Sequence, residues 1–269
     1  MSAPRDATFA FRGHTVRAAQ QPRSSRTDAG DTTGRIVWEC SLSVLKYLSQ
    51  DDHLSLLSAL PLAGKRVLEL SAGAGLVALA LAACGAEVVA AETAEQLPLL
   101  SRNLAAAAAA PPAPAAALYY WGTPLGALAA HPPFDCALCV DVLYIALRDG
   151  LGRELSATLR WLVAGGAARG GLLFAFEERL IDEEGAFMAA LAEPLPPAAG
   201  LCAPGGAPPL RVTELPPPAG ACALTQEEAL SGCGGGGGGG GGEEEEEGAQ
   251  LGALFWQPPP VRLFLLAKV

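Results

Sequence analysis

The chain has 269 residues, 51% of them hydrophobic, which allows a substantial core and excludes a chain that is disordered throughout. Its formal net charge is −10, but five of the negative charges lie in the glutamate run at 243–247, so the remainder is only mildly acidic. Because binding to duplex nucleic acid needs clustered lysine and arginine, this balance argues against a nucleic-acid partner and is compatible with a basic protein surface.

The N-terminal residues 1–33 are expected to form a short hairpin followed by a polar loop. Residues 8–20 alternate loosely around Gly13, which is typical of two strands joined by a tight turn. No apolar run marks a signal peptide or a convincing membrane span, so we expect a cytoplasmic protein without a membrane partner. The nucleus is an alternative, and so is an organelle, because transit peptides are rich in arginine. The arginines concerned are Arg5, Arg12, Arg17, Arg23 and Arg26.

From residue 36 onward the chain predicts an α/β fold. Apolar residues at helical spacing indicate a helix over 36–47, and a second short helix is expected near 53–60. Strands are then expected at 66–70, 87–91, 116–121, 135–140 and 171–177, alternating with helices at 76–84, 94–108, 151–163 and 181–191. Such alternation predicts a parallel sheet that is covered by helices on both faces and doubly wound through right-handed crossovers.

The C-terminal region combines two strand patterns with a low-complexity segment. Residues 210–215 and 261–269 read as strands. Between them, nine consecutive glycines at 234–242 precede the glutamate run, and polyglycine has nothing to bury. We therefore expect a single domain over 1–269, in which 196–253 is a disordered insertion rather than a linker between domains.

The cysteines and histidines do not predict a metal site. Cys136 and Cys139 have the CxxC spacing, but a strand there would place them on opposite faces, and no second pair or nearby histidine completes a site. We expect buried thiols in a reducing compartment and no metal. His14, His53 and His131 are interpreted as surface or structural residues.

The segment VLELSAGAGL, residues 67–76, indicates a ligand site. Its small-residue turn follows a strand and opens a helix, so the backbone can approach a ligand closely at the carboxyl end of a parallel strand. Tight strand-to-helix packing also selects small residues, so the turn alone is weak evidence. Glu92 strengthens it, because an acidic residue about 20 positions later, at the end of the next strand, can accept both hydroxyls of a ribose.

Two cofactors with a ribose are compatible with this arrangement, a dinucleotide and S-adenosylmethionine. A dinucleotide turn has the form GxGxxG, and this chain has no glycine three residues after Gly73. The form ExxxGxG, from Glu69 to Gly75, favours S-adenosylmethionine over a nicotinamide cofactor.

Further segments occur in a specific order and spacing. They are FAFRGHTVRAAQ, GRIVWECSLSVLKYL, GKRVLELSAGAGLVALALAACGAEVVAAE, QLPLLSRNL, LYYWG, FDCALCVDVLY and VRLFLLAKV. Together with the Asp-x-x-Tyr signature at Asp141 and Tyr144, they resemble the seven-β-strand protein-lysine methyltransferases of the methyltransferase-16 family, most closely its methyltransferase-like 21 group. The resemblance extends over nearly the whole chain except 194–253. It implies a Rossmann-like, seven-stranded S-adenosylmethionine-dependent methyltransferase fold with an N-terminal hairpin and helix.

The resemblance also implies roles for individual residues. The backbone of residues 71–73 should contact the methionine part of the cofactor, Glu92 the ribose, and Trp121 the adenine. The complete set expected at the cofactor is Trp38, Ser71, Ala72, Gly73, Glu92, Trp121 and Val140. Asp141 and Tyr144 should face the acceptor amine. The implied activity is transfer of methyl groups to a lysine ε-amine of a protein substrate by a monomeric enzyme.

Departures and alternatives stand beside this interpretation. Ser71, Glu92 and Glu39 occupy positions where the family usually has Gly, Asp and Asp, and a serine at 71 requires either a negative φ or a compensated strain. Structural explanations also exist, namely core packing for Trp38, Trp121 and Tyr144 and a helix cap for Asp141. The functional alternatives are another acceptor (a protein histidine or arginine, or a small amine) and a non-catalytic scaffold that binds the cofactor weakly.

Overall fold

The computed structural model describes most of the chain outside the loops. The described residues are 6–21, 33–50, 61–107, 112–124, 128, 131, 133–198, 200–201, 205–216 and 260–269. The helix expected near 53–60 lies outside them, and so do residues 217–253 of the expected insertion.

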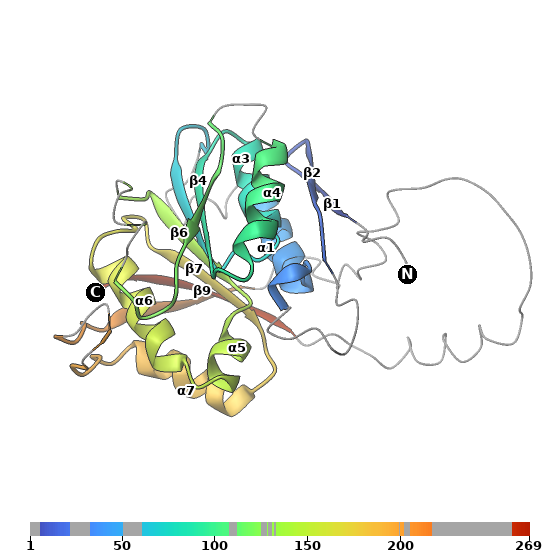
Figure 1. The fold of residues 1–269 in the computed structure, drawn as a ribbon. Coiled ribbons are helices and arrows are strands. Elements are labelled where there is room, and N and C mark those ends of the chain that lie inside the picture. Colours follow the sequence, from blue (N-terminus) through green and yellow to red (C-terminus); the bar gives the residue numbers. More distant parts are fainter. Residues whose placement is uncertain are drawn as a thin grey trace, which may run out of the picture.

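A seven-stranded sheet forms the centre of the molecule (Figure 1). Its strands are β3 (Arg66–Leu70), β4 (Glu87–Glu92), β5 (Ala115–Leu118), β6 (Cys136–Val140), β7 (Leu172–Glu177), β8 (Leu210–Leu215) and β9 (Val261–Lys268). Their order is β5-β4-β3-β6-β7-β9-β8, so the direction of strand progression switches between β3 and β6. This arrangement confirms the seven-stranded methyltransferase fold expected from the resemblance.

The sheet is mixed, whereas the alternation of strands and helices predicted a parallel one. Strands β3 to β7 pair in parallel, but β9 runs antiparallel to both β7 and β8, with Phe174 opposite Phe264 and Leu215 opposite Leu263. The connectivity explains the difference. Strand β9 follows β8 in the chain and pairs with it directly as in a hairpin, rather than through a helical crossover of the kind that joins parallel strands.

Helices cover both faces of the sheet (Figure 1). One face carries α1 (Glu39–Ser49), α3 (Leu76–Ala83) and α4 (Leu97–Ala107), and the other carries α5 (Leu143–Arg148), α6 (Gly152–Ala164) and α7 (Ile181–Leu191). Each group buries its apolar residues in a core of its own. Cys136 packs in the first core and Cys139 in the second, both as buried free thiols, as the CxxC spacing on a strand predicted. Among the described residues, every helix is too short or too polar to cross a lipid bilayer.

The N-terminal hairpin consists of β1 (Ala7–Phe11) and β2 (His14–Ala18), as expected for residues 8–20. Phe11 and Val16 are buried and extend the first core. At the tip, the guanidinium of Arg12 donates hydrogen bonds of 3.2 and 3.1 Å to the carbonyl oxygen of Leu48 in α1. The hairpin thereby holds α1, whose N-terminus carries Trp38.

Three local differences from the sequence-based expectation affect the site. Helix α1 begins at Glu39, so Trp38 is its N-cap residue, with extended backbone, rather than a residue inside the helix. Strand β5 ends at Leu118, which leaves Trp121 in the turn that follows. Helix α5, directly after β6, was not expected at all.

Candidate functional site

A cavity of about 620 Å³ lies at the carboxyl ends of the parallel strands. Its volume is within the usual range of small-molecule sites, and its place is the switch in strand order between β3 and β6. Every residue predicted for the site lines this cavity: Trp38, Ser71, Ala72, Gly73, Glu92, Trp121, Val140, Asp141 and Tyr144. The structure therefore brings the predicted residues together, while the role of each remains a prediction.

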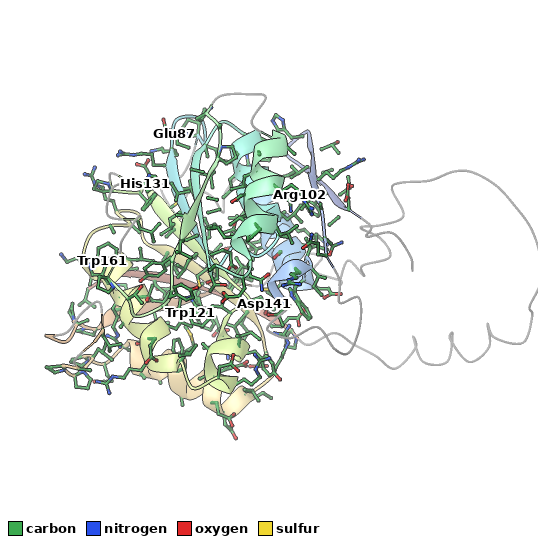
Figure 2. The ribbon with its side chains drawn as sticks, in the orientation of Figure 1. Glu87, Arg102, Trp121, His131, Asp141 and Trp161 are labelled. Atoms are coloured by element: carbon green, nitrogen blue, oxygen red, sulfur yellow. The ribbon has the colours of Figure 1, made fainter. Side chains whose placement is uncertain are left out.

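The lining residues follow the order of the strands. Trp121 comes after β5, Glu92 ends β4, Ser71 comes after β3, and Asp141 comes after β6. Figure 2 shows Trp121 and Asp141 near the centre of the molecule, where both line the cavity. We call the part of the cavity lined by Ser71, Glu92 and Trp121 the cofactor end and the part lined by Asp141 and Tyr144 the acceptor end, after the roles predicted for these residues. Trp38 and Val140, also predicted at the cofactor, line the same cavity.

Two glycines of the turn between β3 and α3 are required by its conformation. Gly73 and Gly75 have φ values of +56° and +81°, which disfavour any other residue. A Cβ atom on Gly75 would lie 2.6 Å from the Cδ1 atom of Leu100 in α4, and one on Gly73 would lie 3.1 Å from the carbonyl oxygen of Gly34. Both glycines line the cavity, and close packing against Leu100 is an additional reason for Gly75.

Two buried acidic side chains, Glu92 and Glu69, accept hydrogen bonds from the backbone of this turn and of the helix after it. Glu92 accepts hydrogen bonds from the backbone N–H groups of Gly73 at 2.8 Å and Thr93 at 2.7 Å. Glu69 accepts one from the N–H of Ala78 in α3 at 2.7 Å. Burial raises the pKa of Glu69 to about 8, and the charge of Glu92 adds to the shift. Glu69 therefore connects β3 to the first turn of α3, as expected for a residue that supports the ligand-binding turn indirectly.

Asn103 of α4 fixes the far end of the same turn. Its side-chain amide donates to the carbonyl oxygens of Ala74 at 2.8 Å and Ala19 at 2.9 Å, and its oxygen accepts from the N–H of Ala19 at 3.2 Å. A buried amide that is satisfied on both sides joins the turn to the segment after β2.

Ser71 has a φ of +56°, so of the two conditions under which a serine is tolerated here, a negative φ and a compensated strain, only the second can apply. Its hydroxyl oxygen accepts a hydrogen bond of 3.0 Å from the indole nitrogen of Trp121. The turn that carries Trp121 is itself anchored by Thr158 of α6, whose hydroxyl oxygen accepts from the N–H of Gly122 at 2.8 Å. Trp121 therefore packs against the second core with one part of its ring system, while its indole nitrogen is oriented by Ser71 at the cavity wall.

Asp141, at the acceptor end, also has left-handed backbone, with a φ of +59°. Its side chain is 6% exposed and forms a two-pronged ion pair with Arg179, with distances of 3.0 and 3.2 Å. Helix α5 begins after Val142 and has no side-chain cap. The interpretation of Asp141 as a helix cap is therefore wrong.

Arg179 is a residue of the site that sequence reasoning missed. Besides Asp141, its guanidinium binds the carboxylate of Glu177, the last residue of β7. It also lies over the rings of Trp38 and Tyr144, at 5.7 and 5.5 Å from their centroids. Its position in the sequence could have identified it. A strand was predicted to end at Glu177, so Arg179 was expected to follow a strand end at the same edge of the sheet as Glu92 and Asp141.

Burial and charge oppose each other in this cluster. Burial raises the pKa of the Glu177 carboxyl, and Arg179 partly counteracts that rise. Burial lowers the pKa of Arg179, but the two carboxylates outweigh it, so the pKa of Arg179 is raised overall. The guanidinium is consequently charged at any physiological pH.

Comparison with known proteins gives one family and many similar folds. A family model described as lysine methyltransferase matches residues 20–194. The protein N-lysine methyltransferase METTL21A of Mus musculus is 30% identical over 141 residues, which cover 52% of this chain and 58% of that protein. The chain thus spans somewhat more than half the length of this relative.

Solved structures with a similar fold are more distant in sequence. A putative RNA methyltransferase from Pyrococcus horikoshii is 14% identical, with 80% of each chain covered and a TM-score of 0.40. The magnesium protoporphyrin IX methyltransferase of Synechocystis, solved with bound SAH, is 14% identical, with 89% of this chain and 90% of that chain covered and a TM-score of 0.40.

Proposed function

The chain belongs to the methyltransferase-16 family of lysine methyltransferases, and from that membership we propose that it transfers methyl groups from S-adenosylmethionine to a lysine ε-amine of a protein substrate. The observation that carries the proposal is that one cavity is lined by the residues predicted for the cofactor and by those predicted for the acceptor. A glycine turn and the carboxylate of Glu92 line it, and so do Asp141 and Tyr144.

The cofactor end suits S-adenosylmethionine by the chemistry of its residues. The backbone of Ser71, Ala72 and Gly73 would hold the methionine part, because the glycine turn leaves the backbone accessible at the cavity. Glu92 would accept the ribose hydroxyls, since its carboxylate lines the cavity at the end of β4 and a carboxylate accepts several hydrogen bonds at once. The indole of Trp121 would flank the adenine. When bound, the cofactor supplies a methyl group on a positively charged sulfonium.

The protein's own contribution is to position the acceptor and to control its protonation. A lysine amine must be neutral to attack, and its ordinary pKa is about 10.4. Desolvation against the ring of Tyr144, close to the positive sulfonium of the cofactor, would lower that pKa. Asp141 can accept a hydrogen bond from the amine through a lone pair that Arg179 does not use, and this aims the nitrogen.

One experiment separates the alternatives for the acceptor. The purified protein is incubated with methyl-labelled S-adenosylmethionine and a protein extract, and the labelled product is hydrolysed and analysed by mass spectrometry. We expect N-methylated lysine. Label on histidine, arginine or a small amine would replace the lysine assignment with another acceptor.

Calorimetry on the same sample separates an enzyme from a scaffold. We expect S-adenosylmethionine and its demethylated product to bind and NAD not to bind. Weak binding without label in any fraction would favour the scaffold, and tight binding of NAD alone would refute the cofactor assignment.

A further inference from the structure

Arg179 differs in charge from the rest of the cavity. Of the described residues that line the cavity, it is the only lysine or arginine, whereas the acidic residues there are Glu69, Glu92, Glu95, Asp141 and Asp149. Its side chain is 23% exposed and is held by two carboxylates and two aromatic rings. A cation so placed at the acceptor end influences both the carboxylate that faces the acceptor and the charge that the acceptor encounters.

We propose that Arg179 is a positioning residue for methyl transfer. Its guanidinium fixes the carboxylate of Asp141 and offsets the charge of the Asp141–Glu177 pair, so that the acceptor amine is present in its neutral form. The inference rests on the proposed function, because it assumes an amine acceptor at this end of the cavity.

The geometry supports the first part of this role. The planar guanidinium contacts both oxygens of Asp141, at 3.0 and 3.2 Å, which fixes the plane of the carboxylate. The backbone N–H of Glu177 donates to one of the same oxygens at 3.3 Å. Lysine would supply a single point charge and could not reproduce the two-pronged contact.

The charge balance supports the second part. The side chains of Asp141 and Glu177 are only 6% and 7% exposed. Two such carboxylates without a counter-charge would attract a proton to the acceptor amine and hold it as ammonium, which cannot attack. The positive charge of Arg179, paired with both carboxylates, lowers the pKa of the acceptor amine and so favours its neutral form.

The other ionisable groups near Arg179 do not replace its charge. On neighbouring elements the groups that interact directly with Arg179, Asp141 or Glu177 are acidic or weakly acidic. They are Glu39 and Cys40 of α1, Tyr144 of α5, and Glu184 of α7. A further cation, Arg148 of α5, lies 6.0 Å from the centroid of the Tyr144 ring, but its guanidinium pairs with the carboxylate of Asp149. Burial raises the pKa of the Cys40 thiol, so that group is neutral.

The test compares methyl transfer by three variants as a function of pH. Arg179→Met keeps much of the side-chain bulk but removes the charge. Arg179→Lys keeps the charge but cannot contact both oxygens of Asp141 at once. Arg262→Met is the matched control, because Arg262 also pairs with two carboxylates, those of Glu178 and Glu214, and stacks on an aromatic ring, but does not line the cavity. Label transferred from S-adenosylmethionine to lysine in a protein extract is measured between pH 6.5 and 9.5.

In Arg179→Met we expect the rate near pH 7 to fall about tenfold or more and the pH profile to move upward by about 1 pH unit or more, so that part of the loss is recovered at high pH. Arg179→Lys should keep the wild-type profile at a reduced rate. S-adenosylmethionine affinity, measured by calorimetry, should change by less than about threefold in both, because Arg179 lies at the acceptor end. Arg262→Met should keep the wild-type profile and rate.

The contrary outcomes are distinct. If Arg179→Met loses the same fraction of activity at every pH, Arg179 does not control the protonation of the acceptor amine, and if its transfer rate rises, Arg179 obstructs the acceptor end; either result overturns the inference and leaves the proposed function intact. If the wild-type protein labels no lysine at all, the proposed function fails and the inference fails with it.

Discussion

The hydrogen bond from the indole nitrogen of Trp121 to the hydroxyl oxygen of Ser71 joins two loops across the cofactor end of the cavity. The two residues follow β5 and β3, which are separated in the sheet by β4. Ser71 has left-handed backbone, which costs a residue other than glycine about 1–2 kcal/mol. The serine that replaces the family's usual glycine therefore carries strain, and its hydroxyl compensates by orienting Trp121.

Substitution of Ser71 by alanine and by glycine separates strain from hydrogen bonding. Ser71→Ala keeps the strained backbone and loses the hydrogen bond, so we expect a loss of about 1 kcal/mol in the free energy of unfolding. Ser71→Gly loses the same bond but relieves the strain, so it should be more stable than Ser71→Ala by about 1 kcal/mol. Chemical unfolding of both variants measures the difference. If the glycine variant is the less stable of the two, the backbone strain at Ser71 is not real.

Both Ser71 variants should also bind S-adenosylmethionine a few-fold more weakly, because the indole of Trp121 is no longer held. Trp121→Phe provides the control by calorimetry. It removes the same N–H group, so combining it with Ser71→Ala should add little further loss. Additive losses would mean that Ser71 and Trp121 act on the ligand independently.

The sheet could be predicted from the sequence because its signals are local. Alternating apolar strands and helical spacing located β8 and α7 to the residue, at Leu210–Leu215 and Ile181–Leu191. The site residues were predicted partly for the same reason, since the carboxyl ends of parallel strands must meet at one edge. The resemblance to a family supplied the choice of residue at each strand end.

What the sequence did not predict depends on contacts between distant segments. Arg179 is far from Asp141 and Trp38 in the chain, so only the folded sheet reveals the cluster that they form. The positive φ of Ser71 is likewise set by the turn and by Trp121, and a serine in sequence does not indicate it. Strand β5 ends early because the turn after it is held by Thr158 of α6, although Tyr119 and Tyr120 favour a strand locally.

Glu69 should make the stability of the protein depend on pH. Its pKa is raised from 4.5 to about 8, chiefly by burial, so the folded protein retains a proton that the unfolded chain releases above about pH 4.5. Stability from this group therefore falls as pH rises from about 4.5 to about 8 and is constant above that range. In Glu69→Gln the amide oxygen can still accept the hydrogen bond from the N–H of Ala78, but the side chain no longer has an ionisable group.

The measurement is the free energy of unfolding at pH 5, 6.5 and 8 for both proteins. We expect the free energy of unfolding of Glu69→Gln, relative to that of the wild type, to increase with pH and to reach a difference of a few kcal/mol at pH 8. A margin that stays constant across this range would show that Glu69 is ionised in the folded protein.

Deletion of residues 234–247 should leave the domain intact. The register places Leu215 of β8 opposite Leu263 of β9, so the ends of the two strands are adjacent and a short connection can join them. Shortening the connection changes its closure entropy by only a few tenths of a kcal/mol. Melting temperature and S-adenosylmethionine affinity should therefore be nearly unchanged, whereas Leu263→Ala, at a buried position of the same hairpin, should cost about 2–5 kcal/mol. A large drop in either quantity after the deletion would give the tract a structural role.

Asp141 should affect turnover more than cofactor binding. Asp141→Asn keeps the size of the side chain but lacks the charge that receives the amine and pairs with Arg179. We expect methyl transfer to fall by roughly 10²-fold, the scale of a lost polar group that orients a reacting atom. Cofactor affinity should fall only a few-fold, because Asp141 lies beyond Val140, at the acceptor end.

The ion pair between Asp141 and Arg179 means that Asp141→Asn should also affect stability. Removing one partner of a largely buried pair destabilises the fold, here by about 1–3 kcal/mol, because Glu177 still pairs with Arg179. Loss of stability alone therefore does not distinguish a structural role from a catalytic one, and turnover has to be measured at a temperature where both proteins are folded.

Asp135→Asn is the matched control for this comparison. Asp135 lies directly before β6, and Asp141 directly after it. The carboxylate of Asp135 accepts a hydrogen bond of 2.9 Å from the N–H of Arg66, and the residue does not line the cavity. It should lose stability without losing turnover per folded molecule. If Asp141→Asn behaves in the same way, with full methylation of lysine by the folded fraction, Asp141 supports the strand end and does not act on the acceptor.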